Sequence, residues 1–219
     1  MDQIWGKSRP ARPDENVRVL EKQFSGKSTA DKLVELREAL DKKKASAMVV
    51  SMLDDIAWLF NLRGSDIPYN PVFFAYALVT QESAKLYINS TKLTDKVIAH
   101  LGKDVSIASY DSIFTDCLTF GQKLTLESAE KEKKKVLLAS KGSWALAKSL
   151  GEDNLIIERS PITDTKAIKN KTEMEGMRQC HIRDGASLIS YFAWLEDYLK
   201  KGNKIDEVEA ADKLEKIRR

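Results

Sequence analysis

The densest group of side chains suited to binding lies in residues 61–71. Its polar members are Asn61, Arg63, Asp66, Tyr69 and Asn70. Gly64 and Pro68 predict a loop here, and loops held by rigid elements often carry binding groups. The guanidinium of Arg63 suits a carboxylate, which is either a structural one such as Asp55 or belongs to a ligand. We therefore treat Asn61, Arg63, Asp66 and Asn70 as candidate site residues.

The sequence does not indicate a metal centre or a nucleophilic catalytic site. A paired metal site needs several His, Asp and Glu side chains together, and neither His100 nor His181 belongs to a ligand-spaced pair. We expect His100 to be structural at a helix end and His181 to be a core or interface residue. Cys180 next to His181 cannot form a dyad, because helical neighbours point about 100° apart. Asp54 and Asp55 are either catalytic carboxylates or acidic residues that open a short helix, and we favour the second. We predict no catalytic residue and no metal ligand.

Composition narrows the class of protein. The 219 residues are 42% hydrophobic and 32% charged, with 10 Gly and 5 Pro, which excludes a disordered or collagen-like chain. No apolar run approaches the roughly 20 residues needed to cross a bilayer. The first residues lack the apolar core of a secretory signal. We therefore expect a globular protein with no membrane partner.

Charge and cysteine usage indicate a cytoplasmic protein that does not bind nucleic acid. The net charge is +3, and the basic runs at 42–44 and 131–135 each close a helix-like segment. They are either phosphate-binding patches or solvated helix ends that favour the helix dipole, and we favour the second. Cys117 and Cys180 form either a disulfide or two buried thiols in a reducing compartment, and we favour the thiols.

Strand-like and helix-like segments alternate through residues 28–158. Residues 1–27 read as an extended lead-in, and a capping-box pattern at Ser28 opens an amphipathic helix over 29–44 with Leu33, Leu36 and Leu40 on one face. Further helices are predicted over 92–101, 110–120 and 143–150, and strands over 47–51, 72–80, 84–89, 105–109, 135–140 and 154–158. The pattern predicts an α/β domain with a hairpin at 72–89 and a sheet covered on both faces.

Two amphipathic helices end the chain. One is predicted over 172–200, with Thr172 as its N-cap and Gly202 as its stop, and the other begins at Asp206. No strands remain for them to cover. We expect either that their apolar faces meet a partner outside this sequence, so that the chain is a fragment, or that they fold back onto residues 28–158.

Several segments resemble the middle domain of eukaryotic cytosolic Xaa-Pro aminopeptidases (aminopeptidase P), which are creatinase/prolidase-type metallopeptidases. The matching segments are Asp55–Asp66, Asn70–Phe74, Lys166–Asn170, Glu175–Arg178, His181–Gly185 and Ala210–Lys213. The resemblance implies a creatinase N-terminal-type α/β domain over 28–165, with a mixed sheet flanked by helices. It also implies that 172–219 are the opening helices of an incomplete pita-bread metallopeptidase domain.

The resemblance further implies the chemistry of the complete enzyme. In that family two metal ions, usually manganese, activate a hydroxide that attacks the bond before a penultimate proline. Their ligands lie beyond the position where this sequence ends, so none is carried over and no cofactor is expected in this chain. The complete enzyme acts on a peptide, and a homodimer is expected only with the full catalytic domain. The loop at 61–71 is expected at the substrate cleft or at an interdomain contact.

The resulting hypothesis is a partial Xaa-Pro aminopeptidase, inactive as this chain because the metal ligands are absent. The alternative is a non-catalytic peptide- or protein-binding scaffold, since a fold does not fix a function.

Overall fold

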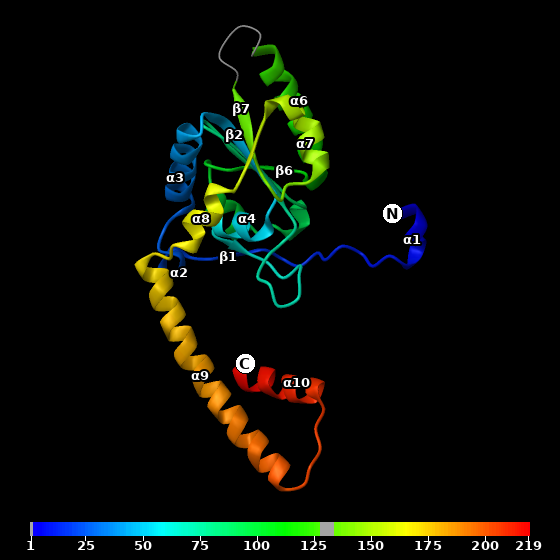
Figure 1. Cartoon of the computed structure of the whole chain (residues 1–219), viewed down its shortest axis with the longest axis vertical. Helices are drawn as coiled ribbons and strands as arrows, with labels where there is room; N and C mark the ends of the chain where they lie inside the picture. Colours follow the sequence, from blue (N-terminus) through cyan, green and yellow to red (C-terminus); the bar gives the residue numbers. More distant parts are fainter. Residues whose placement is uncertain (1, 128–133) are drawn as a thin grey trace. The chain divides into compact units, whose positions relative to one another are not determined.

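The computed structural model describes residues 2–127 and 134–219, which divide into two compact units between Ile168 and Lys169 (Figure 1). The first unit is built around a six-stranded sheet, and the second contains two helices. The predicted mixed α/β fold is confirmed. In the second basic run, residues 131–133 lie outside the described part of the chain.

The sheet of the first unit is mixed. Its strand order is β6-β5-β4-β2-β7-β8; β4 is antiparallel to both neighbours, and the other adjacent pairs are parallel. In that order the strands span Ser106–Ala108, Ala84–Tyr87, Tyr76–Thr80, Ala45–Val50, Lys135–Ala139 and Leu155–Glu158. The predicted hairpin is confirmed as β4–β5, whose turn is closed by the Thr80 amide donating to the Ser83 carbonyl at 2.8 Å.

Helices cover both faces of this sheet. One face packs against α3, α4, α5 and α8, and the opposite face packs against α6 and α7. These helices span, in chain order, Thr29–Lys42 (α3), Leu53–Leu59 (α4), Asp95–Leu101 (α5), Ile113–Glu127 (α6), Trp144–Leu150 (α7) and Pro161–Ala167 (α8). Short 3-10 turns cover Gly6–Ser8, Ser90–Lys92, Tyr110–Ser112 and Glu152–Asn154.

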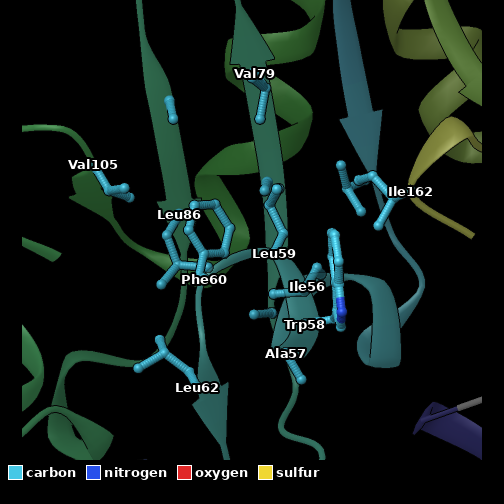
Figure 2. Close-up of a cluster of buried hydrophobic side chains, with 14 of the residues drawn as sticks. Ile56, Ala57, Trp58, Leu59, Phe60, Leu62, Val79, Leu86, Val105 and Ile162 are labelled. Atoms are coloured by element: carbon cyan, nitrogen blue, oxygen red, sulfur yellow. The ribbon is translucent and has the colours of Figure 1, made fainter. Parts of the chain in front are cut away.

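Strand alternation divides the buried side chains between two cores. Successive side chains of a strand point to opposite faces, so Met48 and Val50 of β2 join the core under α4, and Ala47 and Val49 join the other. Figure 2 shows the first core, in which Leu59 of α4 lies among side chains of the sheet. Burying an aliphatic or aromatic side chain of this size contributes about 1.5–3 kcal/mol each.

Helix α3 forms as the sequence predicts. The Ser28 hydroxyl accepts from the Asp31 amide, and the Asp31 carboxylate accepts from the Ser28 amide, which completes a capping box. Leu33, Leu36 and Leu40 are buried on one face. At its other end Lys43 forms an ion pair with Glu158 of β8, and both side chains are partly exposed.

Residues 2–27 contain short elements as well as extended chain. Helix α1 covers Asp2–Trp5, α2 covers Lys22–Ser25, and β1 (Arg18–Val19) pairs antiparallel with β3 (Leu62–Arg63). The Val17 amide donates to the Lys92 carbonyl at 2.9 Å, and the Leu20 amide donates to the Asn61 carbonyl at 2.7 Å. The second half of the lead-in is thereby attached to the α/β unit.

Two predicted boundaries in this unit are wrong by four residues or more. Helix α6 continues past the predicted end at residue 120 to Glu127, and Gly121 lies inside it. A Cβ at Gly121 would lie 2.1 Å from the Leu150 carbonyl oxygen. The glycine therefore permits a close approach of α7 and does not end the helix. The strand predicted from Val72 begins only at Tyr76. Val72 is instead bonded to the 61–71 loop, because its carbonyl accepts a hydrogen bond from the Asp66 amide at 3.1 Å.

The second unit consists of α9 (Lys171–Lys200) and α10 (Glu207–Arg218). The N-cap of α9 is Asn170 rather than Thr172, because Asn170 forms a capping box with Glu173. Gly202, at φ +76°, follows the end of α9 as predicted, and Asp206 caps α10. No helix in the described part of the chain is long and apolar enough to span a bilayer.

Candidate functional site

The loop between α4 and β4 is folded back on itself. The Gly64 amide donates to the Pro71 carbonyl at 3.3 Å, and a β-bridge joins Ile67 to Asn70 nearer the tip. A Cβ at Gly64 would lie 2.6 Å from the Cβ of Phe73, so only glycine lets the two sides approach this closely. The loop therefore has a base at residues 61–66 and a tip at residues 67–70.

Asn61 is part of the buried base. Its backbone adopts φ +51°, which asparagine tolerates better than most residues. The side-chain oxygen accepts from the Lys32 ammonium at 2.6 Å, and the side-chain nitrogen donates to the Lys27 carbonyl at 2.8 Å. The Lys32 ammonium also lies 4.0 Å from the centroid of the Trp58 ring. Asn61 thus ties the loop to α3 and to Lys27, which lies between α2 and α3.

Arg63 supports the base through the backbone. Its Nη1 donates to the carbonyls of Ala57 and Leu62, each at 2.8 Å, and its side chain is half-buried. The carboxylate suggested for it from the sequence, Asp55, lies in a different hydrogen-bonded group described below. These two hydrogen bonds of Arg63 Nη1 hold the backbone in place where the chain passes from α4 into β3.

Asp66 anchors the far side of the base. One carboxylate oxygen accepts from the Phe74 amide at 2.7 Å and forms an ion pair with Lys92, and both charged side chains are almost fully buried. The other oxygen is buried and has no hydrogen-bond partner within the described residues. A buried charge is tolerated only when it is paired, so this pair depends on both members.

The tip differs from the base. Tyr69 is 94% exposed and adopts φ +63°, an uncommon conformation for a bulky residue. Asn70 is also exposed, with its side-chain nitrogen 3.5 Å from the Pro68 carbonyl. Of the four candidate residues, Asn61 and Asp66 are buried, Arg63 is half-buried, and Asn70 alone stands at the exposed tip next to Tyr69. The structure does not gather their polar groups around one point.

Two partners of the site were missed from the sequence. Lys32 donates a hydrogen bond to Asn61, and Lys92 neutralises the charge of Asp66. The side chains of both lysines are buried. The position of Lys32, next to Leu33 on the apolar face of a predicted helix, is a signal that could have identified it as buried. Nothing in the local pattern around Lys92 distinguishes it from an exposed lysine.

The adjacent carboxylates Asp54 and Asp55 do more than open α4. Asp55 is fully buried and accepts from Ser160 Oγ at 3.0 Å, Thr163 Oγ1 at 3.1 Å and Lys166 Nζ at 2.8 Å. Partial burial opposes ionisation of Asp54, but its hydrogen bond and attraction to Lys166 outweigh burial and hold the pKa of that carboxyl below its usual value. Both carboxylates therefore join α4 to α8 through Lys166.

The histidines and cysteines are placed apart from one another. His100 Nε2 lies 3.0 Å from the Phe60 carbonyl, in the structural position expected, whereas His181 is exposed on α9. Cys117 is buried, and burial, followed by the charge of Asp116, raises the pKa of its thiol to about 12. The prediction of two buried thiols is wrong for Cys180, which is exposed.

The described residues do not fit a metal pair. No group of three or more His, Cys, Asp and Glu side chains in residues 2–127 and 134–219 could hold a metal ion. A two-metal hydrolytic centre needs such a set from several elements, and residues 2–127 and 134–219 alone do not supply one.

Comparison with known proteins gives one consistent family. The model of the creatinase/prolidase N-terminal domain matches residues 8–173. The chain is 57% identical over its whole length to a probable Xaa-Pro aminopeptidase P of Aspergillus fumigatus and 55% identical to that of Tuber melanosporum, covering 34% and 36% of their lengths. The chain therefore spans about a third of these curated relatives.

Solved structures share the fold. An X-prolyl aminopeptidase from Caenorhabditis elegans, described as a cytosolic enzyme with a di-nuclear active site, superimposes with a TM-score of 0.90 at 37% identity, covering 98% of this chain and 35% of that one. An Xaa-Pro dipeptidase from Bacillus anthracis superimposes with a TM-score of 0.60 at 10% identity, covering 88% of this chain and 49% of that one, which shows a common fold alone.

Proposed function

The chain belongs to the creatinase/prolidase N-terminal domain family, and from this premise we propose that it is the middle part of an Xaa-Pro aminopeptidase. The complete enzyme would release the N-terminal residue of a peptide whose second residue is proline. The observation that carries this proposal is the 0.90 TM-score at 37% identity over 98% of the chain with an X-prolyl aminopeptidase. The identity to the fungal relatives over the same residues supports it.

The proposal assigns the two units different places in that enzyme. Residues 28–165 would be its second creatinase N-terminal-type domain, and residues 172–219 the first helices of its pita-bread catalytic domain. The exposed apolar residues of the second unit support this assignment, because such side chains are stabilised when other structure covers them. They include Met177, Ile189, Phe192, Leu199 and Val208.

Activity would reside in the complete enzyme rather than in this chain. The relatives are about three times as long, and the described residues contain no metal-ligand group. Two manganese ions, a homodimer built through the catalytic domain, and a cytoplasmic location belong to the same proposal. The Caenorhabditis elegans enzyme is described as cytosolic with a di-nuclear active site, which supports the metal pair and the compartment.

The loop at 61–71 would serve the substrate cleft or an interdomain contact through its tip. The buried base supports this role: Asn61 is held by Lys32, and Asp66 by Lys92 and the Phe74 amide. A fixed base lowers the entropy lost when the tip meets its target. Tyr69 and Asn70 would make the contact, whereas Asn61, Arg63 and Asp66 would position it.

A chimera tests the enzymatic proposal. The matching third of the Aspergillus fumigatus relative is replaced by this chain, and release of the first residue from a peptide with proline second is measured with Mn²⁺. We expect the chimera to turn over and the chain of residues 1–219 alone to be inactive. Sustained metal-dependent turnover by 1–219 would disprove the predicted inactivity. A folded but inactive chimera, together with peptide binding by 1–219, would instead favour a non-catalytic scaffold.

The loop is tested in the active chimera. We expect Tyr69→Ala with Asn70→Ala to lower kcat/KM by about tenfold, equivalent to about 1.4 kcal/mol, without changing thermal stability. Glu82→Ala, on the exposed β4–β5 turn, is the matched control and should leave both unchanged. Unchanged kinetics in the double variant would show that the tip contacts neither the substrate cleft nor a neighbouring domain in a way that affects catalysis.

A further inference from the structure

A cavity of about 600 Å³ lies where the parallel strands β5 and β6 end, apart from the 61–71 loop. Its walls come from the lead-in at residues 12–14, from Phe74, from residues 88–90 and Lys92 after β5, and from residues 107–111 at the end of β6 and just beyond it. Volumes of about 300–1,000 Å³ are typical of small-molecule sites. Crevices outside the carboxyl ends of strands are common ligand positions in α/β sheets.

The inner surface of this cavity is apolar and aromatic. Phe74, Ile88, Ile107 and Tyr110 line it. The Tyr110 ring packs against Tyr76, with ring centroids 5.1 Å apart. Burial, with a hydrogen bond to Tyr76, raises the pKa of the Tyr110 phenol well above its usual value. Tyr110 therefore offers a neutral, fixed ring against which an apolar group of a ligand can pack.

The rim carries charges of both signs. The Arg12 guanidinium lies 5.3 Å from the centroid of the Tyr110 ring and 3.9 Å from a carboxylate oxygen of Asp111, at the limit of an ion pair. One oxygen of Asp14 accepts from Asn89 Nδ2 at 3.1 Å and from Thr91 Oγ1 at 2.7 Å. These bonds hold the lead-in segment across the cavity mouth.

The balance of charge selects the kind of ligand. Lys92 also lines the cavity, but its ammonium is paired with Asp66. The exposed rim charges are therefore one guanidinium and two carboxylates. A ligand that carries both a carboxylate and an ammonium meets each sign with its opposite, whereas a simple anion would meet two carboxylates.

We propose that this cavity binds a small zwitterion with an apolar side chain, which is a free hydrophobic amino acid or a short peptide made of such residues. Arg12 binds the carboxylate, Asp14 and Asp111 bind the ammonium, and the side chain packs on Tyr110 and Ile107. The site is separate from the loop at 61–71 and does not depend on the proposed peptidase function.

Amide chemical-shift titration of the full chain tests the assignment. L-phenylalanine should give saturable shifts confined to residues 12–14, 88–92 and 107–111. Phenethylamine lacks the carboxylate and 3-phenylpropionate lacks the ammonium, so each should bind at least about tenfold more weakly. L-leucyl-L-leucine is titrated in parallel with L-leucine; the tighter binder of these two identifies a peptide or an amino acid as the ligand.

Variants at the exposed rim complete the test without disturbing the core. Arg12→Gln and Asp111→Asn should each weaken L-phenylalanine binding at least about tenfold. Arg18→Gln, an exposed arginine on β1 outside the cavity, is the matched control and should bind normally. The proposal is overturned if L-phenylalanine gives no saturable shifts, if phenethylamine binds as tightly, or if Arg12→Gln binds like the unsubstituted chain.

Discussion

The α/β unit and the helical unit stabilise their helices by different means. Helix α3 has both a capping box and a buried apolar face formed by Leu33, Leu36 and Leu40. Helix α9 has an equivalent capping box, but in residues 169–219, all of which the structure describes, Tyr191 is the only buried side chain. Capping boxes involve only neighbouring residues and form in both units. The two units differ in how many of their helical side chains are buried. The stability of α9 in this chain therefore depends on local interactions to a degree that α3 does not share.

Ion pairs show the same contrast. Asp66 and Lys92 are paired in the interior of the α/β unit, with side chains that are at most 3% exposed. In the helical unit Arg218 forms a two-point contact with Asp184 at 2.6 and 3.2 Å, with both side chains about 40% exposed. Removing one member of a buried pair leaves an uncompensated charge, whereas an exposed pair is screened by water.

The largest expected effect comes from breaking the buried pair. Lys92→Met should lower the free energy of unfolding of the α/β unit by about 3–5 kcal/mol. Arg218→Met, the matched change in the other unit, should lower that of the helical unit by at most about 1 kcal/mol. Hydrogen exchange of amides in β2 and in α9 measures the two units separately. Equal losses in the two units would contradict the contrast. Combining Lys92→Met with Asp66→Asn should recover part of the first loss.

The two cysteines offer a chemical comparison of the same regions. The thiolate is the reactive form, and the raised pKa of about 12 keeps Cys117 protonated at pH 8. Iodoacetamide should therefore modify Cys180 more than about 100-fold faster than Cys117, because Cys117 is both buried and protonated. Mass spectrometry of peptides after timed labelling measures both rates, and labelling in denaturant should equalise them.

The pH dependence of this difference has a definite sign. A thiol pKa that is raised in the folded protein means that the unfolded chain ionises first. The contribution of Cys117 to stability is therefore full below its unfolded pKa near 8.5 and is lost as pH rises toward 12. Labelling of Cys117 at pH 8 that is as fast as that of Cys180 would contradict its assignment as a buried, neutral thiol.

Alanine substitutions at glycines in two helices should have opposite effects on stability. A Cβ at Gly121 of α6 would meet backbone of α7, so Gly121→Ala should destabilise the α/β unit by about 1–3 kcal/mol. A Cβ at Gly185 of α9 would meet nothing within 4 Å, so Gly185→Ala should stabilise α9 by about 0.5–1 kcal/mol. Hydrogen exchange of α6 and α9 measures both changes. A loss of protection in α9 would show that Gly185 has a packing role in this chain.

Local features of the fold could be predicted from the sequence. The Ser28 capping box, the Leu33–Leu40 face, the β4–β5 hairpin and the stop of α9 at Gly202 all depend on residues within a few positions of one another. Periodicity and capping act over that distance. The same local reading misplaced the end of α6, because the role of Gly121 depends on Leu150 in another helix.

The candidate site was predictable in position but not in role. The sequence located the 61–71 loop through its glycine, prolines and polar residues. It could not show that Asn61 and Asp66 face inward, since their partners Lys32 and Lys92 lie 29 and 26 residues away along the chain. Asp55 is a sharper case, because its hydroxyl partner Ser160 is 105 residues away. For polar residues, long-range contacts decide between a binding role and a structural one.

The sequence by itself determined the alternation of strands and helices between residues 29 and 158, a sheet covered by helices on both faces, and the family to which the chain belongs. Each of these follows from local spacing or from long matching segments. Only the tertiary structure decided that the loop has a buried base and an exposed tip, that Cys117 and Cys180 differ, and that a cavity forms between the lead-in and the ends of β5 and β6. The physical reason is that burial and charge pairing depend on which distant segments meet. That information is absent from any short stretch of residues.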